Sequence, residues 1–114
     1  MKIIITEDQR DRVIEKVVFK YLDKRNYIQL DINDKIYFVE NEGDEYVVIR
    51  YDKDGGWCFI SYVLVSFFTK FTNIEKSVIK SIIGRWVEDT LQMKVSNIHI
   101  VDKTFYDGLR IPYN

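Results

Sequence analysis

Apolar residues recur at helical spacing over the first quarter of the chain. Between Glu7 and Arg25 they form two adjacent rows of i, i+4 neighbours, a pattern typical of a helix that packs on a sheet. Thr6 and Gln9 have the spacing of a capping box, so we expect this helix to cover residues 7–25. The two rows contain Val13, Ile14, Val17, Val18, Tyr21 and Leu22.

Segments rich in β-branched and aromatic residues follow, separated by turn-forming clusters. They predict strands at 27–32, 35–40, 45–51 and 57–62. The connections are short, beginning with the hairpin signal Asn33-Asp34, and they predict an antiparallel meander. The second and third strands are apolar or aromatic on both sides. We therefore expect one sheet face to carry helices and the other to be covered by more of this chain or to form a partner surface.

The second half of the chain returns to helical spacing. Residues 62–71 fit a continued strand as well as a short helix, and we favour the helix. Thr72 and Glu75 have the spacing of a capping box that would begin a long helix over 73–92. Gly84 lies inside this helix and suggests close packing against a neighbour. A last strand is expected at 97–101, which makes the chain a single α+β domain over 1–114: a four- to five-stranded, mostly antiparallel sheet with two long helices and one short helix.

Composition limits the classes of protein that this chain can represent. The chain has 114 residues, of which 46% are hydrophobic, and a formal net charge of −1. This content predicts a folded core, and the near-neutral charge gives no overall attraction to nucleic acid or anionic membranes. A lone cysteine, a start unlike a signal peptide and no apolar run of roughly 20 residues favour a cytoplasmic protein without a membrane span.

Residues that commonly carry catalysis or bind metals are few. Cys58 and His99 are the only cysteine and the only histidine, and we interpret them as a buried thiol and a half-exposed strand residue. The run Asp52-Lys53-Asp54-Gly55 resembles the start of a calcium loop. Glycine and glutamate are missing at the sixth and twelfth positions of that loop, so a hairpin turn is the better interpretation. We therefore expect no catalytic, metal-binding or cofactor-binding site and no enzymatic activity.

Acidic residues and tyrosines suggest a protein-binding surface. Residues 26–56 hold eight acidic and three basic side chains, with the acids near the predicted turns. Their simplest interpretation is solubility and protection of strand ends, and the alternative is a docking surface for a basic partner. Exposed tyrosines on a sheet also suit protein recognition. The candidate partner surface consists of Tyr27, Tyr37, Tyr46, Asp31, Glu42, Asp44, Asp52 and Asp54.

The first predicted helix also carries a row of cations at i, i+4 spacing, about 18 Å long. This candidate basic ridge consists of Arg12, Lys16, Lys20 and Lys24. Asp8, Asp11, Glu15 and Asp23 flank the row, and a helix face of mixed sign is most often simply solvated. Nucleic acid is therefore not expected as the main partner.

Two stretches resemble small uncharacterised proteins of tailed bacteriophages. They are the opening nine residues, MKIIITEDQ, and residues 62–71 followed by IIGRWVE at 82–88. The resemblance carries no activity or site residues, and implies a phage setting in the host cytoplasm or the virion. The leading hypothesis is a non-enzymatic accessory protein that acts by protein–protein contact. The alternatives are a virion component that self-associates and a weak nucleic-acid-binding protein.

Overall fold

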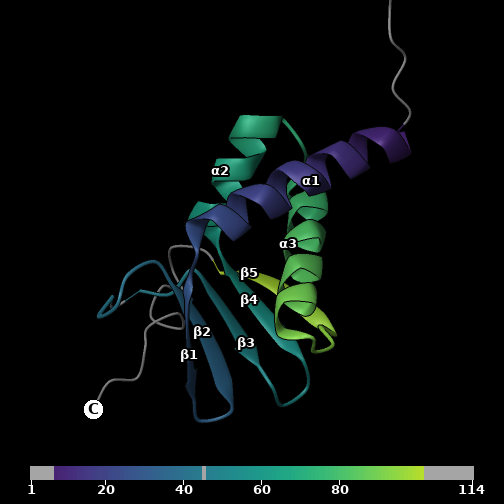
Figure 1. Ribbon diagram of the computed structural model, residues 1–114. Helices are drawn as coiled ribbons and strands as arrows, with labels where there is room; N and C mark the ends of the chain where they lie inside the picture. The colour runs from purple at the N-terminus through teal and green to yellow at the C-terminus, as the bar shows by residue number, and fades with distance from the viewer. Residues whose placement is uncertain (1–6, 45, 102–114) are drawn as a thin grey trace, which may run out of the picture.

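A five-stranded sheet carries three helices on one of its faces (Figure 1). This computed structural model describes residues 7–44 and 46–101. Strands β1 to β4 form an antiparallel meander, and β5 lies parallel to β4 after a crossover through α2 and α3. The predicted α+β class is confirmed. In chain order the elements are α1 (Glu7–Arg25), β1 (Ile28–Ile32), β2 (Lys35–Val39), β3 (Ile49–Asp52), β4 (Trp57–Ser61), α2 (Tyr62–Thr72), α3 (Lys76–Leu91) and β5 (Asn97–Val101).

The meander follows the predicted turns closely. Asn33 and Asp34 both have positive φ, 51° and 62°, as a two-residue hairpin turn of this type requires. The third strand was predicted from residue 45, but regular pairing begins only at Ile49. The backbone N–H of Val48 donates instead to the carbonyl of Phe38 at 2.8 Å, before the regular β2–β3 ladder starts.

The segment that could have been helix or strand is the helix α2. Ser61 accepts a hydrogen bond from the Val63 N–H at 3.3 Å and so caps the helix start. The capping box predicted from Thr72 and Glu75 is wrong, because Thr72 is the last residue of α2. Its hydroxyl donates to the Phe68 carbonyl at 2.7 Å and accepts from the Ile74 N–H. Asn73 then takes a left-handed conformation that ends α2, and α3 starts only at Lys76.

Both faces of the central strands are buried in part, as their sequence suggested. On the helix side, Phe38, Ile49, Ile60 and the α3 residue Ile82 are fully buried within the main core. On the far side, a second buried cluster consists of Tyr37, Val39 and Val47. None of the three helices covers this far side (Figure 1), and its buried centre is not available to a partner.

Only one of the two apolar rows on α1 enters the core. Val18 and Leu22 are fully buried, whereas Val13 is 55% exposed and Val17 is 37% exposed. The apolar periodicity predicts that all four residues lie on one buried stripe, and for Val13 and Val17 that prediction is wrong. The buried face is instead rotated toward Phe19, which is partly buried against the core.

Helix α3 approaches β5 most closely at Gly84. A Cβ atom at this position would overlap Cδ1 of Ile98 and lie 3.1 Å from its Cγ1, which confirms the close packing that the glycine suggested. We expect Gly84→Ala to lower the free energy of unfolding by about 1–2 kcal/mol, because overpacking outweighs the gain in helix propensity. Urea denaturation measures the change.

Two further variants test this cause. Ile98→Val removes the overlapping Cδ1 atom, so the cost of Gly84→Ala should shrink in the double variant. Thr90→Ala, at an exposed position of the same helix, should change stability by less than about 0.5 kcal/mol. Equal costs of Gly84→Ala with and without Ile98→Val would rule out the Ile98 contact as the cause.

Candidate functional site

The structure does not gather the predicted tyrosines on one surface. Tyr27 lies on the helix side and packs against the main core, with its ring edge-on to Trp86 at 6.2 Å. Burial raises the pKa of its hydroxyl to about 12. Tyr37 is buried on the far side of the sheet, and Tyr46 is 43% exposed in the β2–β3 connection. Of the three, only Tyr46 offers a partner a substantial area.

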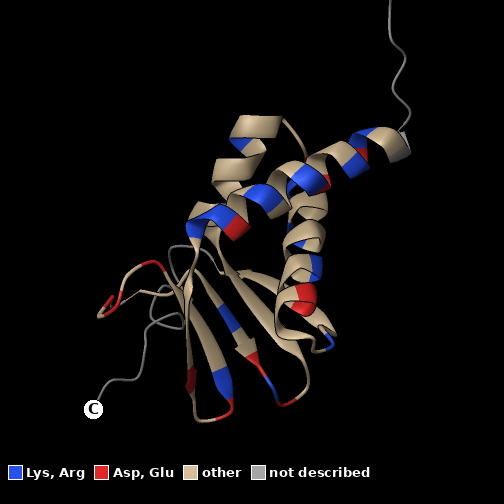
Figure 2. Ribbon diagram, in the orientation of Figure 1, with Lys and Arg blue, Asp and Glu red and all other residues tan. Residues whose placement is uncertain are grey.

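The predicted acidic residues are divided between the two ends of the sheet (Figure 2). Asp31, Asp52 and Asp54 lie at the end that holds the β1–β2 and β3–β4 turns, where Lys53 Nζ approaches Asp31 Oδ2 to 2.6 Å. Asp52 also accepts a hydrogen bond from Arg50 Nε at 2.9 Å. Glu42 and Asp44 lie in the β2–β3 connection at the opposite end. The acids therefore do not form a single docking surface.

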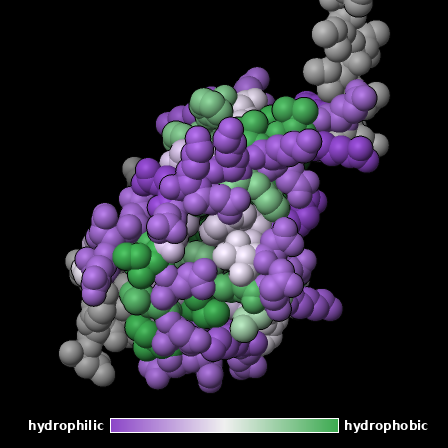
Figure 3. Space-filling view, viewed as in Figure 1, coloured by the Kyte–Doolittle hydropathy of each residue, from purple (hydrophilic) through white to green (hydrophobic). Residues whose placement is uncertain are grey.

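A different surface stands out, formed by exposed apolar side chains of α1 and α2 around Tyr21, which itself packs partly against the core. We call it the outer face, and it is visible as hydrophobic surface between α1 and the top of α2 (Figure 3). Contact between Tyr21 and Phe67, with ring centroids 4.9 Å apart, joins the two helices, and Phe67 stacks on Phe71 at 6.1 Å. The outer face consists of Val13, Val17 and Tyr21 on α1 and of Val63, Phe67 and Phe71 on α2.

The exposure of the outer face is large for apolar side chains. Phe71 is 69% exposed, Val63 54% and Phe67 42%. Beside them, a hollow of about 400 Å³ extends to the β2–β3 connection, and both Phe67 and Tyr46 line it. Glu40 also lines this hollow and forms an ion pair with Arg25. An apolar centre with a charged rim is the usual composition of a protein-binding patch.

The apolar residues of this surface are evident in the sequence, but their periodicity was interpreted as part of the buried core. In each helix the apolar residues form two adjacent rows, and only one row of each helix is buried: Val18 with Leu22 on α1, and Leu64 with Phe68 on α2. A short α2 that contacts the sheet along one row leaves the other row to solvent.

A row of stacked rings also crosses the far side of the sheet at β4 and β5. His99 stacks on Trp57, with ring centroids 4.9 Å apart and an interplanar angle of 6°, and Phe59 continues the stack at 5.7 Å from His99. The Arg50 guanidinium lies over the Phe59 ring at 4.3 Å. Trp57 is 38% exposed and His99 is exposed as well, so part of this row is accessible.

The arrangement of Cys58 and His99 excludes a nucleophile pair. Cys58 pairs in register with Ile98 and belongs to the helix-side core, whereas His99 belongs to the stack on the opposite face. Burial, together with the charge of Asp52, raises the pKa of the Cys58 thiol to about 12, so the reactive thiolate is scarce at neutral pH.

Within residues 7–44 and 46–101, no three His, Cys, Asp or Glu side chains are grouped as metal ligands. None of the described helices has the length and apolar character to cross a bilayer.

The candidate basic ridge is present on α1 as a continuous row of cations (Figure 2). Arg12, Lys16, Lys20 and Lys24 are all exposed and line an open hollow along the helix surface. The ridge and the outer face are neighbouring surfaces of the same helix, because Lys16 and Lys20 follow Val13 and Val17 by three residues.

Burial of the Cys58 thiol predicts a loss of stability in mild alkali. The thiol titrates near its ordinary pKa of 9.0 in the unfolded chain and near 12 in the folded protein. The neutral buried thiol therefore makes its full contribution to the free energy of unfolding below pH 9. This contribution is lost as the pH rises toward 12. Between pH 9 and 10 the free energy of unfolding should fall by up to about 1.4 kcal/mol, measured by urea denaturation. Cys58→Ala should reduce this fall by the share of the thiol and leave the share of the buried tyrosines, whose pKa values are also raised. An unchanged fall in Cys58→Ala would contradict the assignment.

The chain was compared with known proteins at three levels. No protein-family model, no curated protein and no solved structure matches it.

Proposed function

We propose that this protein is a small binding module that acts by contact with another protein through its outer face. One observation carries the proposal: the uncovered apolar rows of two neighbouring helices meet at the Tyr21–Phe67 contact and form one continuous surface. Single exposed apolar residues are common on protein surfaces, but a contiguous group with several aromatic rings marks interaction sites.

The chemistry of the surface indicates what kind of partner fits it. Phenylalanine and tyrosine rings supply a large contact area at a small cost in side-chain entropy, and they are enriched in the centres of interfaces. Phe67 lies between Tyr21 of α1 and Phe71 of α2, and Phe71 is the most exposed ring of the outer face. A partner with an apolar helix or loop suits this surface better than a charged ligand does.

Self-association is the second candidate, because an exposed apolar patch can pair with its own copy. The biological setting in which the protein acts is also part of the proposal. A phage accessory protein, acting in the host cytoplasm or in the virion, rests on the resemblance of residues 1–9, 62–71 and 82–88 alone.

The central test replaces the most exposed rings. In Phe67→Ser/Phe71→Ser, we expect the affinity for the partner to fall at least tenfold, because aromatic residues at the centre of an interface provide much of the binding energy. The midpoint of urea unfolding should change little, because Phe71 is mostly exposed and Phe67 is partly exposed. The partner is first identified by capture from native cells and then purified, so that calorimetry can compare the two proteins directly.

Met93→Ser is the matched control, because Met93 is 38% exposed and lies outside the outer face. This variant should bind as the wild type does, and wild-type binding should have a negative heat-capacity change.

Sedimentation of the purified protein separates the two candidates. A wild-type dimer that becomes a monomer in the double Ser variant would assign the outer face to self-association. Equal affinity of the wild type and the double Ser variant would overturn the proposal.

A further inference from the structure

The candidate basic ridge borders a furrow on the exposed surface of α1. One side of the furrow is the row Arg12, Lys16, Lys20 and Lys24, with about 6 Å of helix rise between successive cations. The other side is the parallel row Glu15, Phe19 and Asp23. Phe19, the middle residue of that second row, is partly buried against the core, so its ring is held in place at the furrow.

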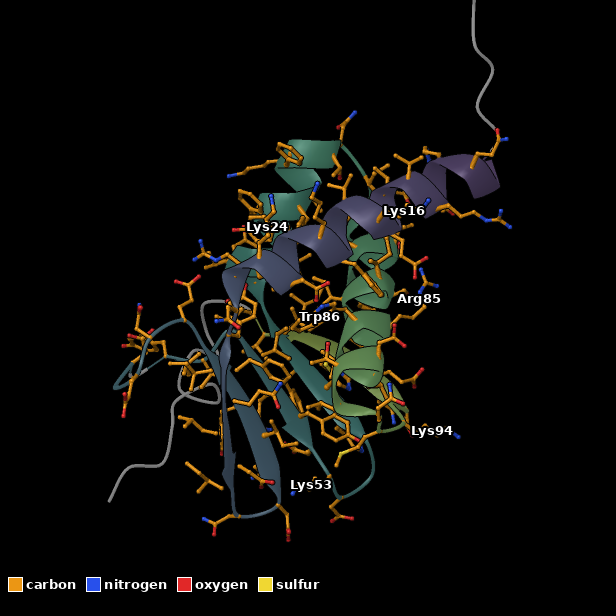
Figure 4. The ribbon with its side chains drawn as sticks, viewed as in Figure 1. Lys16, Lys24, Lys53, Arg85, Trp86 and Lys94 are labelled. Carbon is orange, nitrogen blue, oxygen red and sulfur yellow. The ribbon has the colours of Figure 1, made fainter. Side chains whose placement is uncertain are left out.

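Two of the acidic residues beside the ridge, Glu15 and Asp23, also contact α3. Glu15 Oε1 lies 3.4 Å from Arg85 Nε of α3, which offsets its charge. Asp23 accepts a hydrogen bond from Trp86 Nε1 at 2.9 Å and is thereby directed toward α3. Arg85 and Trp86 both lie on α3, next to α1 (Figure 4). The furrow therefore keeps four cations against two carboxylates, and a cation of α3 offsets the charge of Glu15.

We infer that this furrow binds the phosphate backbone of a single-stranded nucleic acid, with the Phe19 ring against a base. Evenly spaced cations in a straight row can each meet a phosphate, and an aromatic side chain beside such a row is the usual platform for stacking an unpaired base. The acids of the sheet turns and of the β2–β3 connection lie away from the exposed side of α1 (Figure 2), so the local charge differs from the net charge of the chain.

A lipid surface fits the furrow less well. Membrane-binding helices place a broad apolar face in the interface, with cations along its borders. The Phe19 side of the furrow instead holds Glu15 and Asp23 on either side of one partly buried ring. On its other side the ridge borders the exposed Val13 and Val17, so the vesicle arm of the test below separates a lipid surface from a single strand.

The salt dependence of binding tests this inference quantitatively. The probe is a labelled oligothymidylate of about 20 nucleotides. Four phosphate contacts predict that the logarithm of its association constant falls linearly with the logarithm of the salt concentration, with a slope of about −3. Fluorescence anisotropy between about 20 and 200 mM salt measures the slope. In Lys16→Gln/Lys24→Gln, two contacts are lost, and the slope should become about −1.4 with an affinity about tenfold lower at 50 mM salt.

Lys53→Gln/Lys94→Gln is the control, because it changes the net charge equally at the opposite end of the molecule (Figure 4). It should leave the slope and the affinity at the wild-type values. Phe19→Leu keeps an apolar side chain of similar size without the ring. It should weaken binding about fivefold or more without changing the slope, because stacking does not release counterions.

Three results would overturn the inference. They are no oligonucleotide binding at about 20 mM salt, equal losses in the two lysine variants, and binding to phosphatidylserine-containing vesicles but not to the oligonucleotide. Circular dichroism of each variant shows that it is folded. The test is independent of the outer face, because none of these variants changes a residue of that surface.

Discussion

The buried indole of Trp86 joins the three layers of this molecule. Trp86 belongs to α3 and is 5% exposed, and its ring centroid lies 5.6 Å from that of Phe38 on β2. Its Nε1–H donates to Asp23 of α1 at 2.9 Å. A buried N–H without an acceptor costs a substantial part of the stability of a small domain. The position of Asp23, and with it the rotation of α1 about its axis, is therefore tied to the packing of α3 on the sheet.

The rotation of α1 decides what each of its faces does. Side chains on a helix have fixed angular offsets, so directing Asp23 toward α3 also directs Leu22 and Val18 into the core. Val13 and Val17 are then exposed beside α2, and the cations at 12, 16, 20 and 24 form the exposed ridge. One packing constraint thus produces both the outer face and the furrow that holds Phe19. Their proposed partners differ in chemistry, but both surfaces depend on the same helix orientation.

Much of the fold could be predicted from the sequence, because local signals and the global structure agree. The bounds of α1 and β5 match the prediction, and the Asn33-Asp34 turn is where its chemistry placed it. The errors occur where tertiary contacts override a local pattern. Thr72 has the spacing of a capping residue, yet its hydroxyl completes the preceding helix.

The candidate site was less predictable, because apolar periodicity does not show which of two adjacent rows is buried. That choice is made by tertiary contacts such as the Trp86–Asp23 hydrogen bond, which joins residues 63 positions apart. The tyrosine and acidic positions failed to converge for a related reason. Their distribution depends on strand register and on which sheet end each turn occupies, which a list of residue types does not contain.

The most direct measurement is the solvent accessibility of individual methyl groups, recorded by NMR with a soluble paramagnetic agent at low protein concentration. The central claim is that the Trp86–Asp23 contact exposes one apolar row of α1 while it buries the other. This claim predicts strong paramagnetic relaxation for Val13, Val17 and Val63, and weak relaxation for Val18, Leu22 and Leu64. Protection of Val13 and Val17 equal to that of Val18 would contradict it.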